Sequence, residues 1–219
     1  MKKAHLLLVI ACSVLIISAC TDEYIEVGPP VYYEPVQIGN QIWMKRNLHE
    51  SRYRNGDPIP EVRDSAQWAN LTTGAWCYYK NNQNSIFGKL YNWYAVNDPR
   101  GLAPQGWHIP SDSEWKVLTN FLGGEEIAGG KLKDSTTNYW LKLSSGATNE
   151  SGFYALPGGY RQFDSKFGDA GNYANWWSSA ESSITSAWFF NIVSEYNYLY
   201  RIDDDKKYGF SVRCVKDLD

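Results

Sequence analysis

The chain has 219 residues, with 21 Lys and Arg against 24 Asp and Glu, and it is rich in aromatic residues, including 10 Trp and 16 Tyr. A mildly acidic chain is a poor partner for nucleic-acid phosphates, so the composition argues against nucleic-acid binding. The length suits one domain of ordinary size with a core of its own. Trp and Tyr both fill cores and line extracellular binding surfaces, so their abundance fits either use.

The N-terminus is typical of a bacterial lipoprotein signal over residues 1–19. Lys2 and Lys3 precede an apolar run that is shorter than the roughly 20 residues of a membrane-spanning helix. The end of this run, followed by Cys20, resembles a lipobox, which implies cleavage before Cys20 and a lipid on its thiol. An ordinary secreted protein is the alternative. Cleavage would remove two of the 21 basic residues and leave 19 against 24 acidic ones.

Residues 20–35 are expected to form a flexible tether, because they contain Gly and Pro without any clear periodicity. The acidic Asp22 and Glu23 resemble the surface-export signals of Bacteroidetes-type lipoproteins. We therefore expect an outer-membrane lipid anchor that displays the protein on the cell surface, with the periplasmic face as the alternative. The lipid would be its only contact with the membrane, and residues 36–217 would form a single domain.

The domain is expected to open with a β-hairpin. Residues 36–38 and 41–44 are β-prone runs on either side of Gly39-Asn40. An irregular, exposed segment rich in Arg, Asp, Pro and Asn follows over residues 47–67. In residues 87–96 the apolar side chains recur at intervals of three and four, which predicts a helix.

The clearest helix signal begins at Ser111, which Glu114 follows three residues later in the pattern of a capping box. The side chains expected to face the core from this helix are Trp115, Leu118, Phe121 and Leu122. Gly123-Gly124 is expected to end it, because glycine adopts left-handed backbone conformations without strain.

From Phe153 onward the pattern changes to short β-prone runs separated by turns. They cover residues 153–156, 173–179, 187–193, 196–202 and 209–215. Helices that precede strands, without βαβ alternation, indicate an α+β fold with an antiparallel sheet. The run Asp203-Asp204-Asp205 fits a solvated turn better than a calcium site, because basic residues flank it.

Two cysteines remain after Cys12 leaves with the signal and Cys20 is lipidated, namely Cys77 and Cys214. Disulfides persist outside the cytoplasm, so we expect these two thiols to form a bridge. Two buried free thiols are the alternative, because the sequence does not show how close the two Cα atoms lie.

Six runs of the sequence resemble, in order, the Fibrobacter succinogenes major paralogous (FISUMP) domain. They are IGNQIWMKRNL, FGKLYNWYAV, GLAPQGWHIPSDSEW, ALPGGYR, WWSSA and GFSVRCVKD. That family is similar in turn to the C-type lectin-like and formylglycine-generating-enzyme fold. The resemblance implies an α+β, C-type lectin-like architecture, with two helices flanking a twisted antiparallel sheet and long irregular loops. It also implies that the chain ends lie together, which would bring Cys214 near the element that holds Cys77.

No motif for catalysis or metal binding stands out. The chain after the signal has only His49 and His108, and His108 is expected to be a packed or hydrogen-bonded structural residue, with a catalytic base as the alternative. The neighbouring cysteine pair that formylglycine-generating enzymes use for copper is missing, as are the calcium motifs of sugar-binding C-type lectins. We therefore expect a protein that is not an enzyme, with no catalytic residues, no metal and no cofactor.

The loop region 157–177 is the expected ligand surface, because it mixes aromatic rings with polar groups. Its candidate contacts are Tyr160, Arg161, Asp164, Asn172, Tyr173 and Trp176. Mere scaffolding is the alternative, and at least one of Trp176 and Trp177 is expected in the core, since neighbouring strand residues point in opposite directions. The expected function is a binding or adhesion module for an extracellular glycan or protein. A structural component of a surface assembly and an enzyme with an unrecognised site are the alternatives.

Overall fold

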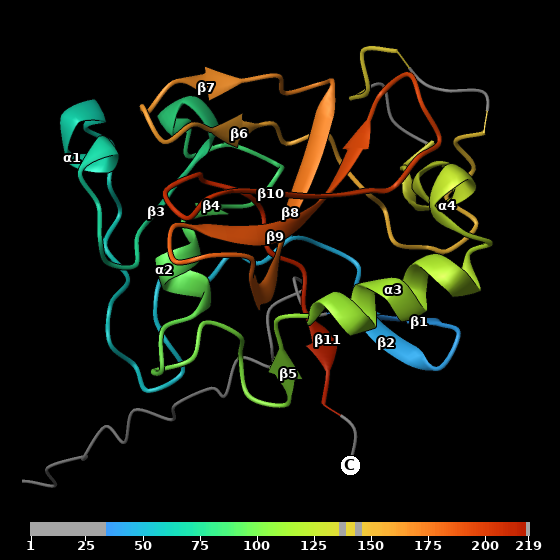
Figure 1. Cartoon of the computed structure of the whole chain (residues 1–219), viewed down its shortest axis with the longest axis horizontal. Helices are drawn as coiled ribbons and strands as arrows, with labels where there is room; N and C mark the ends of the chain where they lie inside the picture. The colour runs from blue at the N-terminus through green and yellow to red at the C-terminus, as the bar shows by residue number, and fades with distance from the viewer. Residues whose placement is uncertain (1–33, 136–138, 143–145, 218–219) are drawn as a thin grey trace, which may run out of the picture.

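The computed structural model describes residues 34–135, 139–142 and 146–217 of the chain. The expected signal segment and residues 20–33 of the expected tether, which include Cys20, lie outside the described residues. Short strands, short helices and long connecting loops make up the fold (Figure 1). In the described part of the chain, no helix has the length and apolar character needed to cross a membrane.

The strands pair into several separate sheets, and every strand pair is antiparallel. One sheet has the order β1-β2-β11-β5, with β1 (Pro35–Ile38), β2 (Gln41–Met44), β11 (Val215–Lys216) and β5 (Trp107–His108). Another has the order β10-β9-β8, with β8 (Tyr173–Glu181), β9 (Ser186–Val193) and β10 (Tyr200–Asp205). Two-stranded ribbons pair β3 (Trp76–Cys77) with β4 (Leu90–Tyr91), and β6 (Tyr160–Arg161) with β7 (Phe167–Gly168).

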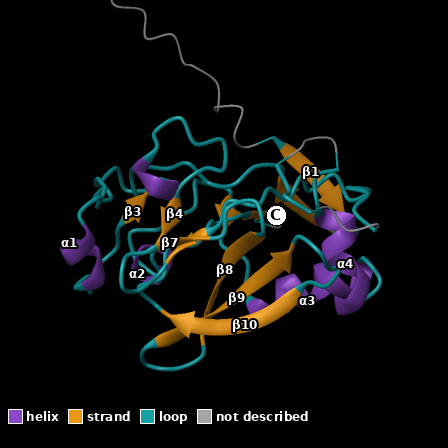
Figure 2. Cartoon of the chain, turned by 90° about the horizontal axis from the view of Figure 1, so that it is seen from above, coloured by secondary structure: helices purple, strands orange, loops and turns teal. Residues whose placement is uncertain are grey.

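The helices are α1 (Ser65–Ala69), α2 (Trp93–Val96), α3 (Asp112–Phe121) and α4 (Glu125–Leu132), with a 3-10 turn η2 (Tyr79–Asn81). The predicted lectin-like arrangement, two helices flanking one twisted sheet, is wrong. The two longest helices, α3 and α4, follow each other on the same side of the molecule (Figures 1 and 2). Most strands have only two to four residues, which is too short to build one continuous sheet.

The segment of residues 209–216 joins all of these sheets. Gly209 exchanges backbone hydrogen bonds with Arg161 of β6, and Phe210 exchanges them with Tyr91 of β4. Ser211 accepts a hydrogen bond from the backbone of Trp177 in β8, and β11 then pairs with β2 and β5. The predicted strand over residues 209–215 is therefore extended but does not pair with one neighbour, because Gly209, Phe210, Ser211 and Val215 meet four different sheets.

Helix α3 begins as the capping-box pattern predicts. The Ser111 hydroxyl accepts a hydrogen bond from the Glu114 backbone, and the Glu114 carboxylate accepts one from the Ser111 backbone at 2.8 Å. The predicted core stripe is confirmed for Trp115, Leu118 and Leu122, which are buried. Phe121 is 62% exposed, so its predicted burial is wrong. Its ring covers Gly39 of the hairpin, where a Cβ atom would lie 2.9 Å from it.

The predicted helix over residues 87–96 is wrong in its first half. Leu90 and Tyr91 form strand β4, and the helix α2 covers only Trp93–Val96. The buried side chain of Asn92 separates the two elements, because its carbonyl oxygen accepts hydrogen bonds from the backbone of Ala95 and of Ala75. The hydrogen bond from Ala95 caps helix α2. The hydrogen bond from Ala75 fixes the adjacent segment of the same chain.

Among the predicted strands, the hairpin around Gly39 and the runs over 173–179 and 187–193 are confirmed by β1, β2, β8 and β9. Residues 153–156 form no strand, and only Ala155 makes an isolated bridge. Strand β10 begins later than predicted and ends at Asp205, so the predicted aspartate turn is wrong. The turn follows at Lys206 and Lys207 instead.

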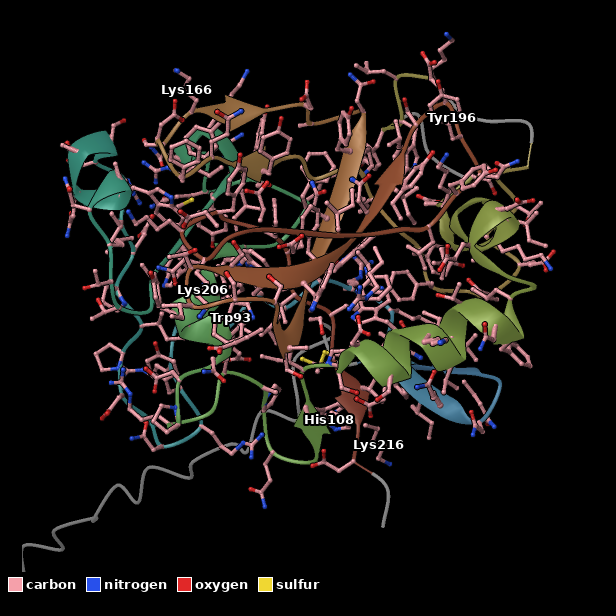
Figure 3. All side chains as sticks on the ribbon, viewed as in Figure 1. Trp93, His108, Lys166, Tyr196, Lys206 and Lys216 are labelled. Carbon is pink, nitrogen blue, oxygen red and sulfur yellow. The ribbon has the colours of Figure 1, made fainter. Side chains whose placement is uncertain are left out.

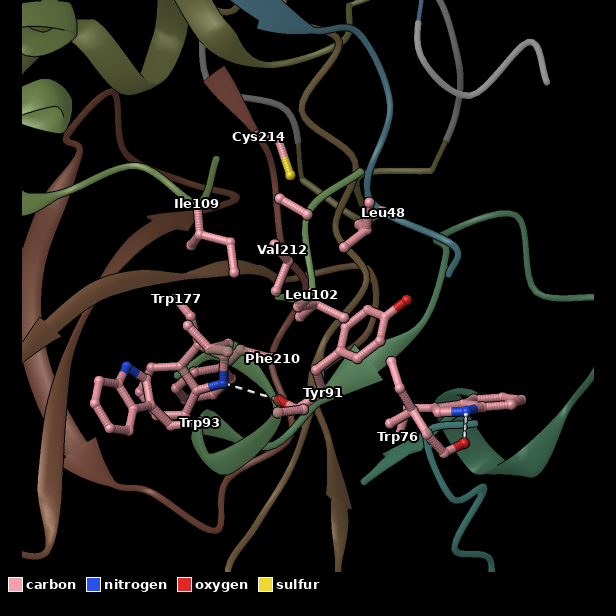
Figure 4. Packing of buried hydrophobic residues seen from close by; sticks show 14 of the residues in the cluster. Leu48, Trp76, Tyr91, Trp93, Leu102, Ile109, Trp177, Phe210, Val212 and Cys214 are labelled. Atoms are coloured by element: carbon pink, nitrogen blue, oxygen red, sulfur yellow. Dashed lines mark hydrogen bonds between the residues drawn. The ribbon is translucent and has the colours of Figure 1, made fainter. Parts of the chain in front are cut away.

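Aromatic side chains form the centre of the largest hydrophobic cluster (Figure 4). The ring centres of Trp177 and Phe189 lie 4.5 Å and 4.4 Å from the ring centre of Phe210. The Trp177 indole donates a hydrogen bond of 2.8 Å to the Tyr91 backbone carbonyl. A separate cluster lies around Trp176, and a smaller one around Trp68. Both Trp176 and Trp177 are fully buried, so the side chains of both lie in the core.

The predicted disulfide is wrong, because Cys77 and Cys214 are both buried free thiols. Trp76 pairs with Tyr91, and Cys77 pairs with Leu90, in the β3–β4 ribbon. Neighbouring strand residues point to opposite faces, so Tyr91 faces the large cluster that holds Cys214, whereas Cys77 faces the small cluster around Trp68. Burial raises the pKa of both thiols, to about 12 for Cys77.

Candidate functional site

A cleft of about 750 Å³ lies where several loops meet beside the ends of β2 and β11. Side chains from within residues 45–49, 83–88 and 154–156 line it, together with Glu34, Asp134, Tyr139 and Arg213. Ligand sites for small molecules commonly have volumes of roughly 300–1,000 Å³, so the cleft has a suitable size.

Aromatic rings and amides form the accessible part of the cleft. Tyr139 and Tyr154 are 41% and 40% exposed, and the Tyr139 ring meets the edge of Phe87 with ring centres 6.0 Å apart. Asn84 and its neighbour Gln83 add exposed amide groups. Ring faces combined with convergent amides can stack on a sugar and hydrogen-bond to its hydroxyl groups.

Asn47 ties the walls of the cleft together. Its amide nitrogen donates to the Phe87 carbonyl at 2.8 Å and to the Ser211 hydroxyl at 3.1 Å. Its amide oxygen accepts from the Trp176 indole at 2.8 Å and from the Arg213 guanidinium at 2.8 Å. The Asn47 amide therefore makes its hydrogen bonds within the protein, and it holds the segments that form the cleft in place.

Two backbone features bring the walls close together. Gly88 has φ of +81°, and a Cβ atom there would lie 3.0 Å from the Cβ of Asn47. Tyr154 also has a left-handed backbone, with φ of +55°, and its N–H donates to the Asn149 side chain at 2.9 Å. A tyrosine rarely adopts this conformation, so the Asn149 contact stabilises a strained backbone at Tyr154, whose side chain lines the cleft.

A group of titratable side chains lies beside the cleft. His49 lines it and shares a hydrogen bond of 2.9 Å with the Tyr78 hydroxyl. Burial lowers the pKa of His49, and the charge of Lys89 lowers it further, so the imidazole is neutral at pH 7. Burial lowers the pKa of Lys89 to about 8. The Lys89 ammonium donates to the Ser51 hydroxyl and lies 3.8 Å from the centre of the Trp76 ring.

Two of the ligand contacts predicted from the sequence are wrong, because Arg161 and Trp176 are fully buried. Arg161 donates to the Val62 carbonyl at 2.6 Å and to the Arg63 carbonyl at 3.0 Å, and it stacks on Trp68. Its guanidinium therefore fixes the segment before α1. Trp176 lies in the core, and its indole donates a hydrogen bond to the cleft residue Asn47.

The other four predicted contacts are partly exposed but do not line the cleft. Tyr160 donates to Asp169 at 2.8 Å, and its ring meets the edge of Tyr173. Asp164 pairs with Lys166 at 2.7 Å. Asn172 accepts a hydrogen bond of 3.3 Å from Ser194. The structure thus gives each of them a neighbour within the protein, and ligand contact at these residues stays a prediction.

No cluster of three or more His, Cys, Asp or Glu side chains that could hold a metal ion occurs among the described residues. The aspartates of β10 are dispersed by their strand geometry: Asp203 accepts a hydrogen bond from Ser182, and Asp205 lies at the strand end. Neighbouring strand residues point to opposite faces, so consecutive aspartates do not converge on one ion.

The sequence matches the family described as the Fibrobacter succinogenes major domain over residues 36–216. The chain belongs to this family. The resemblance noted in the sequence is thereby confirmed at the level of the family. A search of curated proteins gives no match to the chain.

Four of the six runs that carry the family resemblance meet at the cleft. Lys45, Arg46 and Asn47 come from the first run, Phe87 from the second, Leu156 from the fourth and Arg213 from the last. The site was not predicted from the sequence, because these four runs contribute only one to three side chains each and loops bring them together. The sequence signal for the site is the position of the six runs, because four of them coincide with segments that form the cleft.

Proposed function

We propose that the domain is a non-enzymatic binding module, and that its cleft binds a glycan of a few sugar units. The observation that carries this proposal is the cleft of about 750 Å³ with the exposed rings of Tyr139 and Tyr154 at its mouth. Aromatic rings offer flat apolar faces, and the neighbouring amides offer donors and acceptors to hydroxyl groups. The proposed function keeps the binding role expected from the sequence but assigns it to another surface.

A glycan suits the cleft better than a folded protein does. Stable protein interfaces bury roughly 800 Å² on each partner and are broad, whereas a small ligand is enclosed by concave walls. The rings of Phe87 and Tyr139 stand edge to face, so they line a corner of the cleft. A corner of this kind can hold one face and one edge of a sugar ring.

The N-terminal sequence supports a place for this module outside the cell. We propose that Cys20 carries a lipid and anchors the protein in the outer membrane, facing the medium, since an extracellular module would meet glycans there. Protease shaving of intact cells should remove the domain while a periplasmic protein stays intact. A Cys20→Ala variant should lose its membrane association. Protection of the domain in intact cells would argue for the periplasmic face.

The binding site is tested with oligosaccharide arrays, followed by calorimetry on the ligands found, using the purified protein. Tyr139→Ala and Tyr154→Ala should each weaken binding about tenfold, because each removes one ring contact. Tyr196→Ala is the matched control, since Tyr196 is 52% exposed and does not line the cleft. Thermal unfolding of each variant shows whether the fold is retained.

Unchanged affinity in both cleft variants would rule out the cleft as the glycan site. A Tyr160→Ala variant then decides whether the ligand lies on the region 157–177 instead, because Tyr160 is partly exposed there. Absence of glycan binding, together with co-purification of fixed partners from detergent extracts, would favour a structural role in a surface assembly.

A further inference from the structure

Two arginines line the cleft without a carboxylate partner among the described residues. Arg213 is 1% exposed and donates only to neutral oxygens, those of Met44, Phe153 and Asn47. Arg46 is exposed and makes no hydrogen bond or ion pair with any described residue. A buried cation that lacks a counter-ion is costly, so Arg213 favours an anion nearby, and the unpaired charge of the exposed Arg46 lies beside the same cleft.

The two guanidinium groups are close enough to repel each other. The pKa of Arg213 is lowered to about 9, mainly by burial and to a smaller extent by the like charge of Arg46. An anion placed between two like charges removes this repulsion, and arginine is well suited to hold carboxylate and sulfate oxygens.

Among the described residues, no other charged group that lines the cleft forms an ion pair with Arg46 or Arg213. Lys45 is paired with Glu34, so that pair has no net charge. Asp134 is buried and engages other groups of its own. His49 is neutral at pH 7 because burial and Lys89 lower its pKa. The charge of Arg46 is therefore left to face an incoming ligand.

Arg213 adds positive charge beside the cleft but makes no direct ligand contact, because it is 1% exposed. A guanidinium carries five N–H groups, and the four hydrogen bonds of Arg213 go to Met44, Phe153 and, twice, to Asn47. Arg213 lines the cleft, with its guanidinium held 4.0 Å from the centre of the Phe153 ring. These contacts fix the position of its charge before any ligand arrives.

We infer that the cleft selects acidic sugars, with a carboxylate or sulfate ester bound by Arg46 in front of Arg213. The inference rests on the proposed function and names the chemical class of its ligand. The rings of Tyr139 and Tyr154 contact the sugar face, and the arginines recognise its charge. Recognition of charge also makes binding weaker at high salt, because Arg46 is exposed to solvent.

The test compares matched oligosaccharides by calorimetry with the purified protein. One pair is an oligogalacturonide and its carboxyl-reduced, neutral form, and a second pair is a chondroitin sulfate oligosaccharide and its desulfated form. The acidic member of at least one pair should bind tenfold or more tightly than its neutral or desulfated counterpart, and the two pairs show whether carboxylate or sulfate is preferred. Arg46→Gln should remove this preference, so that the acidic and neutral forms bind with similar affinity. Arg52→Gln is the control, since Arg52 is exposed outside the cleft and changes the net charge equally.

Equal affinity for the acidic and counterpart members of both pairs would overturn the inference while leaving the proposed glycan site in place. A preference that survives in Arg46→Gln, or is lost equally in Arg52→Gln, would overturn it as well. Failure of every oligosaccharide to bind, acidic or neutral, would instead count against the proposed function itself.

Discussion

Buried cations that lie against aromatic rings recur through this protein. They are Lys89 on Trp76, Lys133 on Trp140, Arg161 on Trp68, Lys206 on Trp93 and Arg213 on Phe153. Figure 3 labels Lys206 and Trp93, whose ammonium and ring centre are 4.8 Å apart. All but Lys89 also donate to backbone carbonyls of irregular segments. A loop-rich fold leaves many buried carbonyls without strand partners, and a ring-stacked cation satisfies several at once.

Arg161 tests this role at the scale of a single residue. Arg161→Met removes donors from the Val62 and Arg63 carbonyls, so the free energy of unfolding should fall by roughly 3 kcal/mol. Urea titration of the purified protein measures it. Lys166→Met is the control, because Lys166 lies on the same hairpin with its side chain 78% exposed, and its change should stay within about 0.5 kcal/mol. Equal effects in the two variants would contradict a structural role for Arg161.

At the scale of elements, His108 connects three parts of the chain. Its ring lies on β5, with Nδ1 2.7 Å from the Asp217 carboxylate after β11 and Nε2 2.6 Å from the Glu114 carboxylate of α3. Burial alone would lower the pKa of His108, but the two carboxylates outweigh it and raise the pKa above 6.5. Glu114 thus serves both the helix cap and this bridge, and the ring has the structural role expected for His108.

The bridge predicts a pH dependence of stability. Because the folded-state pKa of His108 is raised, the protonated ring contributes stability that is fully present below its unfolded value of 6.5. This contribution should be lost as the pH rises through the folded-state pKa. Urea unfolding at intervals between about pH 6 and pH 8 should therefore show a decline that is absent in His108→Gln. The same decline in both proteins would assign it to other groups.

At the scale of the whole molecule, the segment 209–216 makes the separate sheets into one unit. Phe210 is the packing centre of this segment, with its ring 2% exposed among Trp177, Phe189 and Tyr208. Since consecutive residues of the segment meet different sheets, disruption at one point weakens contacts among several sheets. The sheets are too small to be stable alone, so the protein should unfold cooperatively.

Phe210→Ala tests this arrangement. Removal of the buried ring should lower the free energy of unfolding by about 3–5 kcal/mol, with tryptophan fluorescence and circular dichroism still following one transition. Phe163→Ala is the control, because Phe163 is 48% exposed, and its effect should be small. Separate transitions for the two probes would mean that the sheets unfold independently.

The sequence by itself determined the features that depend on neighbouring residues and on the family pattern. The capping box at Ser111 and the hairpin at Gly39 follow from local backbone preferences, which act within a few residues. The tertiary structure alone decided the sheet arrangement, the free state of Cys77 and Cys214, and the cleft around Asn47 and Arg213. The physical reason is that these features depend on loops and buried hydrogen bonds between distant segments, whose partners leave no periodic signal in the chain.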